Sequence, residues 1–127
     1  MDAEKIARRW FLAALPYFLV SVGIGVYMGA SSDHALFTVH SHVGLLGWAA
    51  MGLTGLLYRT FPAAATSKLA AWHFFLYQAA VPVMLIAVTA LILGNKSAEP
   101  VAGAASVLIL ISVVLFCWNI WSARRSG

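Results

Sequence analysis

The sequence predicts an all-α fold, a bundle of four transmembrane helices that forms a single domain over residues 1–127. Hydrophobic residues make up 62% of the chain and charged residues only 9%, whereas charged residues account for ~25% of an average soluble domain. A run of ~20 apolar residues is typical of a helix that crosses a bilayer. Four such runs fit the sequence, at about residues 10–30, 36–60, 68–93 and 100–122. Little chain is left over, so we expect short connections and no soluble domain.

The first and third spans each contain a proline. Pro16 and Pro82 fall inside the apolar runs, and prolines kink helices but are tolerated in membranes. Thr66 or Ser67 is expected to cap the third span, because a hydroxyl oxygen accepts hydrogen bonds from the first unpaired amides of a helix. The apolar run of the first span is longer than the core of a signal peptide, so we expect this span to be retained.

The basic residues predict the orientation of the chain, because Lys and Arg gather on the cytoplasmic side of membrane proteins. With four spans, seven of the eight basic residues fall on one side and only Lys96 falls on the other. The seven are Lys5, Arg8, Arg9, Arg59, Lys68, Arg124 and Arg125. We therefore expect a multi-pass protein of the bacterial inner membrane with both termini in the cytoplasm. The net charge of +4 is attributed to this topology, and no nucleic-acid partner is expected.

No carboxylate falls inside any predicted span. Asp2, Glu4, Asp33 and Glu99 all lie near the amino terminus or in turns. A small proton-coupled multidrug transporter needs a membrane carboxylate to exchange protons and to bind cations. The sequence therefore disfavours that class. The polar groups inside the membrane are chiefly histidines, tyrosines, Gln78 and hydroxyls.

Two histidines near the start of the second span, in TVHSHVGLLGW, are the main candidates for chemistry. Successive helical residues are ~100° apart, so His40 and His42 point about 200° apart and cannot both bind one metal ion on a regular helix. The His42 face is rich in leucine, whereas the His40 face is lined with glycine. The His40 face comprises His40, Gly44, Gly47, Met51, Gly55 and Tyr58.

Two simpler interpretations of these residues remain open. The histidines lie about one to two helical turns below the outer boundary, where they can hydrogen-bond near the lipid headgroups. The glycines can serve helix packing, because small residues let membrane helices approach each other. Such packing is compatible with a cofactor that lies across the same face.

The other two histidines are not expected to join this pair. His73 falls near the inner end of the third span, and the apolar core of a bilayer is ~30 Å thick. A metal–imidazole bond is only ~2 Å long, so His73 and His40 are not expected to share an iron. A packed and hydrogen-bonded role is favoured for His73. His34, in or near the outer turn, either supports a site or is solvated.

The stretch from His40 to about Leu85 resembles the tenth and eleventh helices of subunit I of the haem-copper oxidase superfamily. The matching sequence reads HSHVGLLGWAAMGLTGLLYRTFP and then SKLAAWHFFLYQ. The shared pattern is a His-any-His pair, small residues and glycines, an aromatic–Phe-Pro ending, a Lys-Leu loop, and a His-Phe pair that opens the next helix. The resemblance covers about a third of the chain, and the order and spacing of several features agree.

The resemblance implies that the two histidines serve different haems. In that family the first histidine of the pair binds the oxygen-reducing haem and the second binds the low-spin haem, which agrees with the helix geometry. The family subunit has three arcs of four helices, with ligand histidines on the second helix of each arc. This chain resembles one arc. We therefore expect a homotrimer in which His40 of one protomer and His42 of its neighbour bind one haem b iron.

The resemblance also implies contacts around the haem. Propionates face the outer side in that family, and Lys96 is the only outer cation here. The residues expected to lie on or near the porphyrin are Gly44, Gly47, Trp48, Met51 and Tyr58. Trp48 and Tyr58 are also compatible with ordinary packing in the core or at the membrane interface.

Several parts of an oxidase are missing from the sequence. The three further histidines of the family's copper site, its proton-channel carboxylate and its His-Tyr pair are absent. If histidines fill both axial positions of the haem, none is open to oxygen. We therefore expect electron transfer or haem carriage without copper, and not a complete oxidase. A quinol is a conceivable electron donor, with Tyr77, Gln78 or His73 as its contacts.

Two other functions remain open from the sequence. One is a haem-free structural or assembly subunit of a respiratory membrane complex, in which the glycine face docks a partner helix. The other is a metal-ion carrier or channel with rings of His40 or His42 on a symmetry axis. The lack of membrane carboxylates disfavours the second.

Overall fold

The computed structural model describes residues 2–124, so the predicted contribution of Arg125 to orientation lies outside the described residues. The described chain is helical and contains no strand, which confirms the all-α class. Its elements are α1 (Ala3–Ser31), α2 (Phe37–His42), η1 (Val43–Ala49), α3 (Ala50–Thr60), α4 (Pro62–Ala65), α5 (Lys68–Ile92), η2 (Lys96–Ala98) and α6 (Glu99–Ala123). Of these, η1 is a π-helix and η2 is a short 3₁₀ helix.

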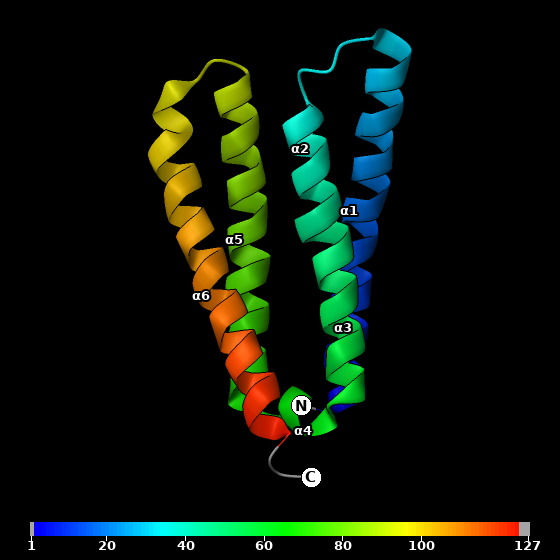
Figure 1. Ribbon diagram of the computed structural model, residues 1–127, viewed down its shortest axis with the longest axis vertical. Helices are drawn as coiled ribbons and strands as arrows, with labels where there is room; N and C mark the ends of the chain where they lie inside the picture. Colours follow the sequence, from blue (N-terminus) through cyan, green and yellow to red (C-terminus); the bar gives the residue numbers. More distant parts are fainter. Residues whose placement is uncertain (1, 125–127) are drawn as a thin grey trace.

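The helices form two pairs that run side by side (Figure 1). α1 packs along α2, η1 and α3, and α5 packs along α6. The short helix α4 connects the pairs at one end of the molecule, where α1 begins and α6 ends. The pairs lie close together at this end and move apart toward the other end, which carries the α1–α2 turn and η2.

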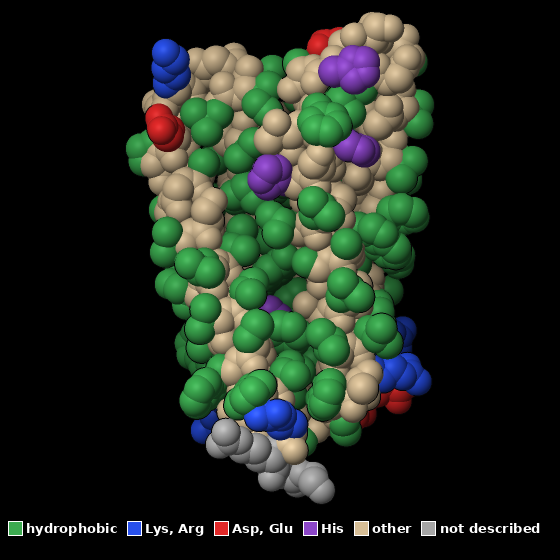
Figure 2. All heavy atoms as spheres, in the orientation of Figure 1, with side chains coloured by type: hydrophobic (Ala, Val, Ile, Leu, Met, Phe, Trp, Pro, Cys, Tyr) green, Lys and Arg blue, Asp and Glu red, His purple; other side chains and the backbone are tan. Residues whose placement is uncertain are grey.

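Within residues 2–124, three helical stretches are long and apolar enough to cross a membrane, which indicates a membrane protein. They are α1, α5, and η2 together with α6. Lys, Arg, Asp and Glu side chains lie toward the two ends of the molecule in Figure 2, and hydrophobic side chains cover the region between them. α1 begins at Ala3, earlier than the predicted residue 10. The Asp2 carboxylate accepts a hydrogen bond from the Glu4 amide at 3.3 Å and so starts the helix ahead of the apolar run.

The second predicted span corresponds to three helical elements in line. α2, η1 and α3 follow one another from Phe37 to Thr60 without a break. The ends agree with the prediction of a helix at about 36–60, but the middle is not a regular α-helix. In the π-helical part, Val43–Ala49, the hydrogen bonds span five residues instead of four, and the Ala50 amide accordingly donates to the Leu45 carbonyl.

Short local signals set the ends of α5 and α6. The Ser67 hydroxyl accepts a hydrogen bond from the Ala70 amide at 3.3 Å, which confirms one of the two predicted caps. Gly94 follows α5 with φ of +96°, a conformation that glycine adopts without steric strain. Pro100 lies in the first turn of α6, where its missing amide hydrogen costs no helical hydrogen bond.

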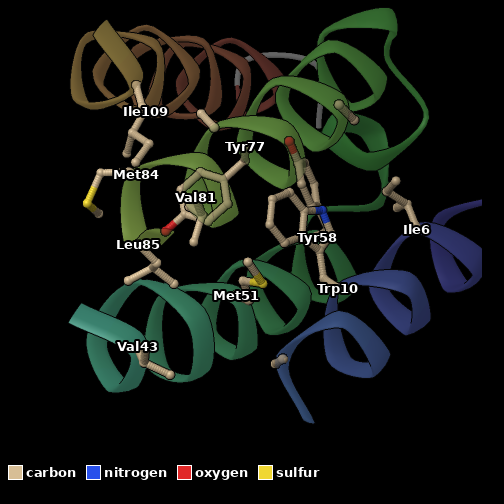
Figure 3. Packing of buried hydrophobic residues seen from close by; sticks show 14 of the residues in the cluster. Ile6, Trp10, Val43, Met51, Tyr58, Tyr77, Val81, Met84, Leu85 and Ile109 are labelled. Carbon is tan, nitrogen blue, oxygen red and sulfur yellow. The ribbon is translucent and has the colours of Figure 1, made fainter. Parts of the chain in front are cut away.

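The core lies between the two pairs of helices, and the close view in Figure 3 shows side chains of α1, η1, α3, α5 and α6 that belong to it. Trp10 of α1 and both Met51 and Tyr58 of α3 are 0% exposed. Asn119 of α6 donates from its side-chain amide to the Ala64 carbonyl of α4, at 2.9 Å. This end of the molecule is therefore closed and well packed, whereas an apolar groove lies between the helix pairs in the half that carries the histidine pair.

Candidate functional site

His40 lies half-buried on α2, and α1 holds its imidazole ring. Its Nδ1 atom is 2.8 Å from the carbonyl oxygen of Ser21. A carbonyl oxygen only accepts hydrogen bonds, so Nδ1 carries the hydrogen and donates it. The Ser21 hydroxyl donates in return to the backbone carbonyl of His40, at 3.3 Å. The two residues therefore join α1 and α2 through a reciprocal pair of hydrogen bonds.

A glycine on α1 provides the space for the His40 ring. A Cβ atom at Gly25 would lie 3.1 Å from the Cε1 atom of His40, which is a tight contact. A Cβ atom at Gly23 or Gly29 of the same helix would have no neighbour within 4 Å. Gly25 is therefore the α1 glycine on which the position of the imidazole depends.

His42 is held by its own helix. Its Nδ1 atom is 2.8 Å from the carbonyl oxygen of Thr38, one turn earlier. By the same reasoning, this Nδ1 atom donates its hydrogen. The ring is half-buried. The two histidines are thus anchored on different helices, which agrees with the predicted divergence of their side chains.

The two anchors leave the same atom available on each ring. A neutral imidazole with its hydrogen on Nδ1 has a lone pair on Nε2. Neither Nε2 atom has a hydrogen-bond partner among residues 2–124. Metal-binding histidines usually donate their other ring N–H to a carbonyl, a carboxylate or water, which fixes the ring and raises its basicity. His40 and His42 both have this arrangement.

The π-helix η1 begins directly after His42 and is held from two sides. The Tyr77 hydroxyl of α5 donates to the carbonyl oxygen of Leu46 at 3.0 Å. On the other side, the Tyr17 ring of α1 lies so close to Gly47 that a Cβ atom there would be 2.3 Å from it. π-helical turns are frequent at functional sites. Here the turn connects the histidine pair to the buried part of the helix.

The predicted glycine face packs against α1 of the same chain. A Cβ atom at Gly44 would lie 2.9 Å from the Ser21 hydroxyl, and one at Gly55 would lie 3.1 Å from the Ala7 carbonyl oxygen. Met51, on the same face, is fully buried. The helix-packing interpretation of the glycines is therefore confirmed.

Two further predicted haem contacts, Trp48 and Lys96, lie away from the glycine face. Trp48 is 37% exposed and stacks on Phe18 of α1, with ring centroids 4.3 Å apart. Lys96 is exposed in η2, at the open end of the molecule. His34 is exposed in the α1–α2 turn, with Nδ1 3.1 Å from the Ser32 carbonyl oxygen.

An apolar groove of about 640 Å³ lies beside the histidine pair, between α1, α2 and α5. Its volume falls in the range of ~300–1,000 Å³ that is typical of small-molecule and cofactor sites. Val39 and Val43 line the groove. His40 follows Val39 and His42 precedes Val43, so each histidine is turned about 100° from the valine next to it. The histidines therefore flank the groove and do not line it.

His73 is distant from the histidine pair and has the packing role that was predicted. It is 1% exposed, and its Nδ1 atom is 3.0 Å from the Tyr58 hydroxyl. Its ring packs on Trp10, with ring centroids 4.7 Å apart. Trp10 contacts His73, and Ser21 contacts His40. Along the axis of α1 these two residues are ~16 Å apart, because a helix rises 1.5 Å per residue. Within one chain, therefore, His73 and His40 cannot bind the same metal ion.

The side chains predicted as quinol contacts are engaged inside the protein. Tyr77 is 3% exposed and uses its hydroxyl on the π-helix. The Gln78 amide nitrogen lies 3.5 Å from the sulfur of Met51, and His73 is buried. None of the three lines the apolar groove.

The residues that anchor the histidines are not predicted by the sequence. Ser21 and Gly25 lie one turn apart on α1. This spacing of small residues is a known signal for the close approach of a second membrane helix. It indicates a neighbour for α1, but not that the neighbour is His40. The bond from His42 to Thr38 and the π-helical turn have no comparable signal in the sequence.

Comparison with known proteins finds no relative of this chain. No protein-family model, no curated protein and no solved structure matches it.

Proposed function

We propose that this protein is a small membrane cytochrome b that transfers electrons and does not reduce oxygen. The observation that carries the proposal is the common anchoring of His40 and His42. Each donates from Nδ1 to a backbone carbonyl and keeps the Nε2 lone pair, as an axial histidine of a haem does. The resemblance of the stretch from His40 to about Leu85 to haem-copper oxidase subunit I supports the same assignment.

In this proposal the chain crosses a bacterial inner membrane four times, with both termini in the cytoplasm. α1, α5 and α6 supply three crossings. The stretch Phe37–Thr60 supplies the fourth, because it exceeds the ~20 residues that a crossing helix needs. The positive-inside tendency places the α4 end in the cytoplasm. The described basic residues on the segments that meet at that end are Lys5, Arg8, Arg9, Arg59, Lys68 and Arg124.

The haem would lie between protomers. His40 and His42 are anchored on different helices and diverge, so one chain supplies a single ligand to each iron. In a cyclic trimer the same two patches meet at every interface, and His40 of one protomer pairs with His42 of the partner subunit. The trimer would hold three equivalent bis-histidine haems and no copper. Held by His40 and His42 together, such a haem would carry electrons and would not bind oxygen.

The residues of the chain would hold the haem and exclude water from it. When bound, the haem carries the electron, and the protein supplies ligands, orientation and an apolar surrounding. The groove of about 640 Å³ provides an apolar surface at the level of the histidines. Trp48 is accessible to a porphyrin across the interface, and Lys96 is a cation for a propionate. Gly44 and Gly47 would contribute indirectly, by letting α1 pack against the helix that carries the histidines, and Met51 would contribute to the buried packing of that helix.

The absorption spectrum of the purified protein tests this proposal. We expect the Soret and α bands of a low-spin, bis-histidine haem b. Native mass spectrometry should give three times the chain mass of 13.6 kDa plus three haems. His40→Ala and His42→Ala should each abolish the low-spin bands. His34→Ala is the matched control, because His34 is exposed in a turn, and this variant should keep them.

Co-expression of the two variants tests the pairing between chains. A His40→Ala chain retains His42, and a His42→Ala chain retains His40, so a mixed trimer contains at least one intact ligand pair. We expect co-expression to restore part of the low-spin spectrum that each variant alone has lost. A normal spectrum in both single variants would refute the pairing, and so would an absence of restoration in demonstrably mixed trimers.

The haem-free structural subunit is the alternative outcome of the same experiment. A protein that purifies colourless, and that gains no Soret band when haem is added, would support it. In this alternative the glycine face docks a partner helix. In the structure, α1 covers that face, so the glycines do not require a partner protein.

A further inference from the structure

A small pocket lies at the α4 end of the molecule, between α1 and α3. Its volume is about 210 Å³, and Glu4, Arg8, Phe11 and Leu12 of α1 line it together with Arg59 of α3. Arg59 is distant in sequence from the four residues of α1, and the close packing of the two helices brings them together.

A glycine permits the crossing that forms this pocket. A Cβ atom at Gly55 would lie 3.1 Å from the Ala7 carbonyl oxygen and 3.2 Å from the Cβ atom of Trp10. α3 therefore approaches the backbone of α1 one turn before Arg59. Arg8 follows Ala7 on α1, and so both guanidinium groups border the same pocket.

The charges in this pocket favour an anion. No ion pair joins Arg8 or Arg59 to a carboxylate in the part of the chain that the structure describes. Guanidinium groups present planar sets of N–H donors that match the oxygens of a phosphate. Glu4 is the one carboxylate in the lining, so the pocket holds two positive charges and one negative charge. The Glu4 carboxylate can also accept a hydrogen bond from a hydroxyl group of a ligand.

The apolar part of the lining continues toward the middle of the membrane. Phe11 is 37% exposed and Leu12 is 54% exposed. Both follow Arg8 on α1 in the direction of the apolar band. A ligand that fits the whole surface has an anionic head beside the arginines and an apolar tail along Phe11 and Leu12. A membrane lipid has its headgroup and acyl chains in the same order, from the surface of the bilayer to its interior.

We propose that this pocket binds an anionic phospholipid whose headgroup carries hydroxyl groups. Arg8 and Arg59 hold the phosphate, Glu4 accepts a hydrogen bond from a headgroup hydroxyl, and an acyl chain lies along Phe11 and Leu12. A zwitterionic choline headgroup is disfavoured because it places a cation beside two guanidinium groups. A free phosphate is disfavoured because it leaves the apolar part of the surface uncovered. This site is independent of the haem assignment.

Native mass spectrometry of the detergent-purified protein tests the site, with phosphatidylglycerol as the probe and phosphatidylcholine as the comparison. We expect phosphatidylglycerol to bind the native protein more tightly than phosphatidylcholine. The double variant Arg8→Gln with Arg59→Gln should lose this binding by about tenfold or more, because each basic side chain near the surface contributes substantially to attraction of anionic lipids. The single variants should each show an intermediate loss and remain informative if the double variant does not fold.

The matched control removes two charges at the same end of the molecule but on the other pair of helices. Lys68→Gln with Arg124→Gln should leave phosphatidylglycerol binding within about twofold of the native protein, since neither residue lines the pocket. Equal losses in the two double variants would overturn the proposal in favour of a general effect of charge. Glycerol phosphate should fail to displace the lipid at millimolar concentration. Full displacement by glycerol phosphate would show a phosphate site without a lipid-chain contact.

Discussion

Each imidazole of the histidine pair is fixed by one hydrogen bond from Nδ1. For His40 the acceptor is a carbonyl of another helix, so the ring position depends on how closely α1 and α2 approach. For His42 the acceptor lies on the same helix, so the ring position depends on local backbone only. His40 should therefore be the more sensitive of the two to changes in helix packing.

Replacement of Gly25 by valine tests this difference at the residue scale. A Cβ atom at Gly25 already lies 3.1 Å from the His40 ring, and the additional methyl groups of valine would displace it. We expect Gly25→Val to reduce haem content per chain strongly while the protein still folds and inserts. Gly29→Val, where the added Cβ atom has no neighbour within 4 Å, should retain haem at the native level. Equal haem contents in the two variants would show that the His40 position does not depend on Gly25.

The π-helical turn is the main feature at the scale of single elements. It depends on partners from two other helices: Tyr17 of α1 packs on Gly47, and Tyr77 of α5 bonds the Leu46 carbonyl. Tertiary contacts from both helices thus stabilise the turn.

Gly47→Ala should destabilise the protein through this turn. The added Cβ atom would lie 2.3 Å from the Tyr17 ring, so either the ring or α1 must move. Overpacking of this kind costs about 1–3 kcal/mol. The control is Gly52→Ala, where nothing lies within 4 Å of the added atom, and its stability should be unchanged or slightly higher. Reversible unfolding in mixed micelles measures both, and a Gly47→Ala variant as stable as the control would contradict the observed packing.

At the scale of the whole molecule, one end is closed and the other is open. Aromatic and polar side chains join the two helix pairs near α4, where His73 bonds Tyr58 and Asn119 bonds Ala64. The pairs separate toward the end that carries η2. The histidine pair lies in the half where the helix pairs separate, beside the apolar groove.

Reporter fusions test the proposed orientation of the molecule. An alkaline phosphatase domain inserted after Asn95, in the turn between α5 and η2, should be active, because that enzyme matures only outside the cytoplasm. A green fluorescent protein fused behind α6 should be fluorescent, because the basic residues hold the α4 end inside. An inactive phosphatase together with a dark fluorescent fusion would reverse the orientation. If both reporters are active when they are fused at the same site, the protein does not have a single topology.

The sequence by itself determined the all-α class, the apolar helices and the divergence of His40 and His42, because these follow from composition and from the fixed angle between helical residues. It also indicated that His73 is packed and that Ser67 caps α5. Only the tertiary structure decided what anchors His40, what covers the glycine face and where the helix becomes π-helical. Those features are contacts with α1 and α5. The sequence pattern of one helix records which face is small or apolar, but not which neighbouring atom will meet it.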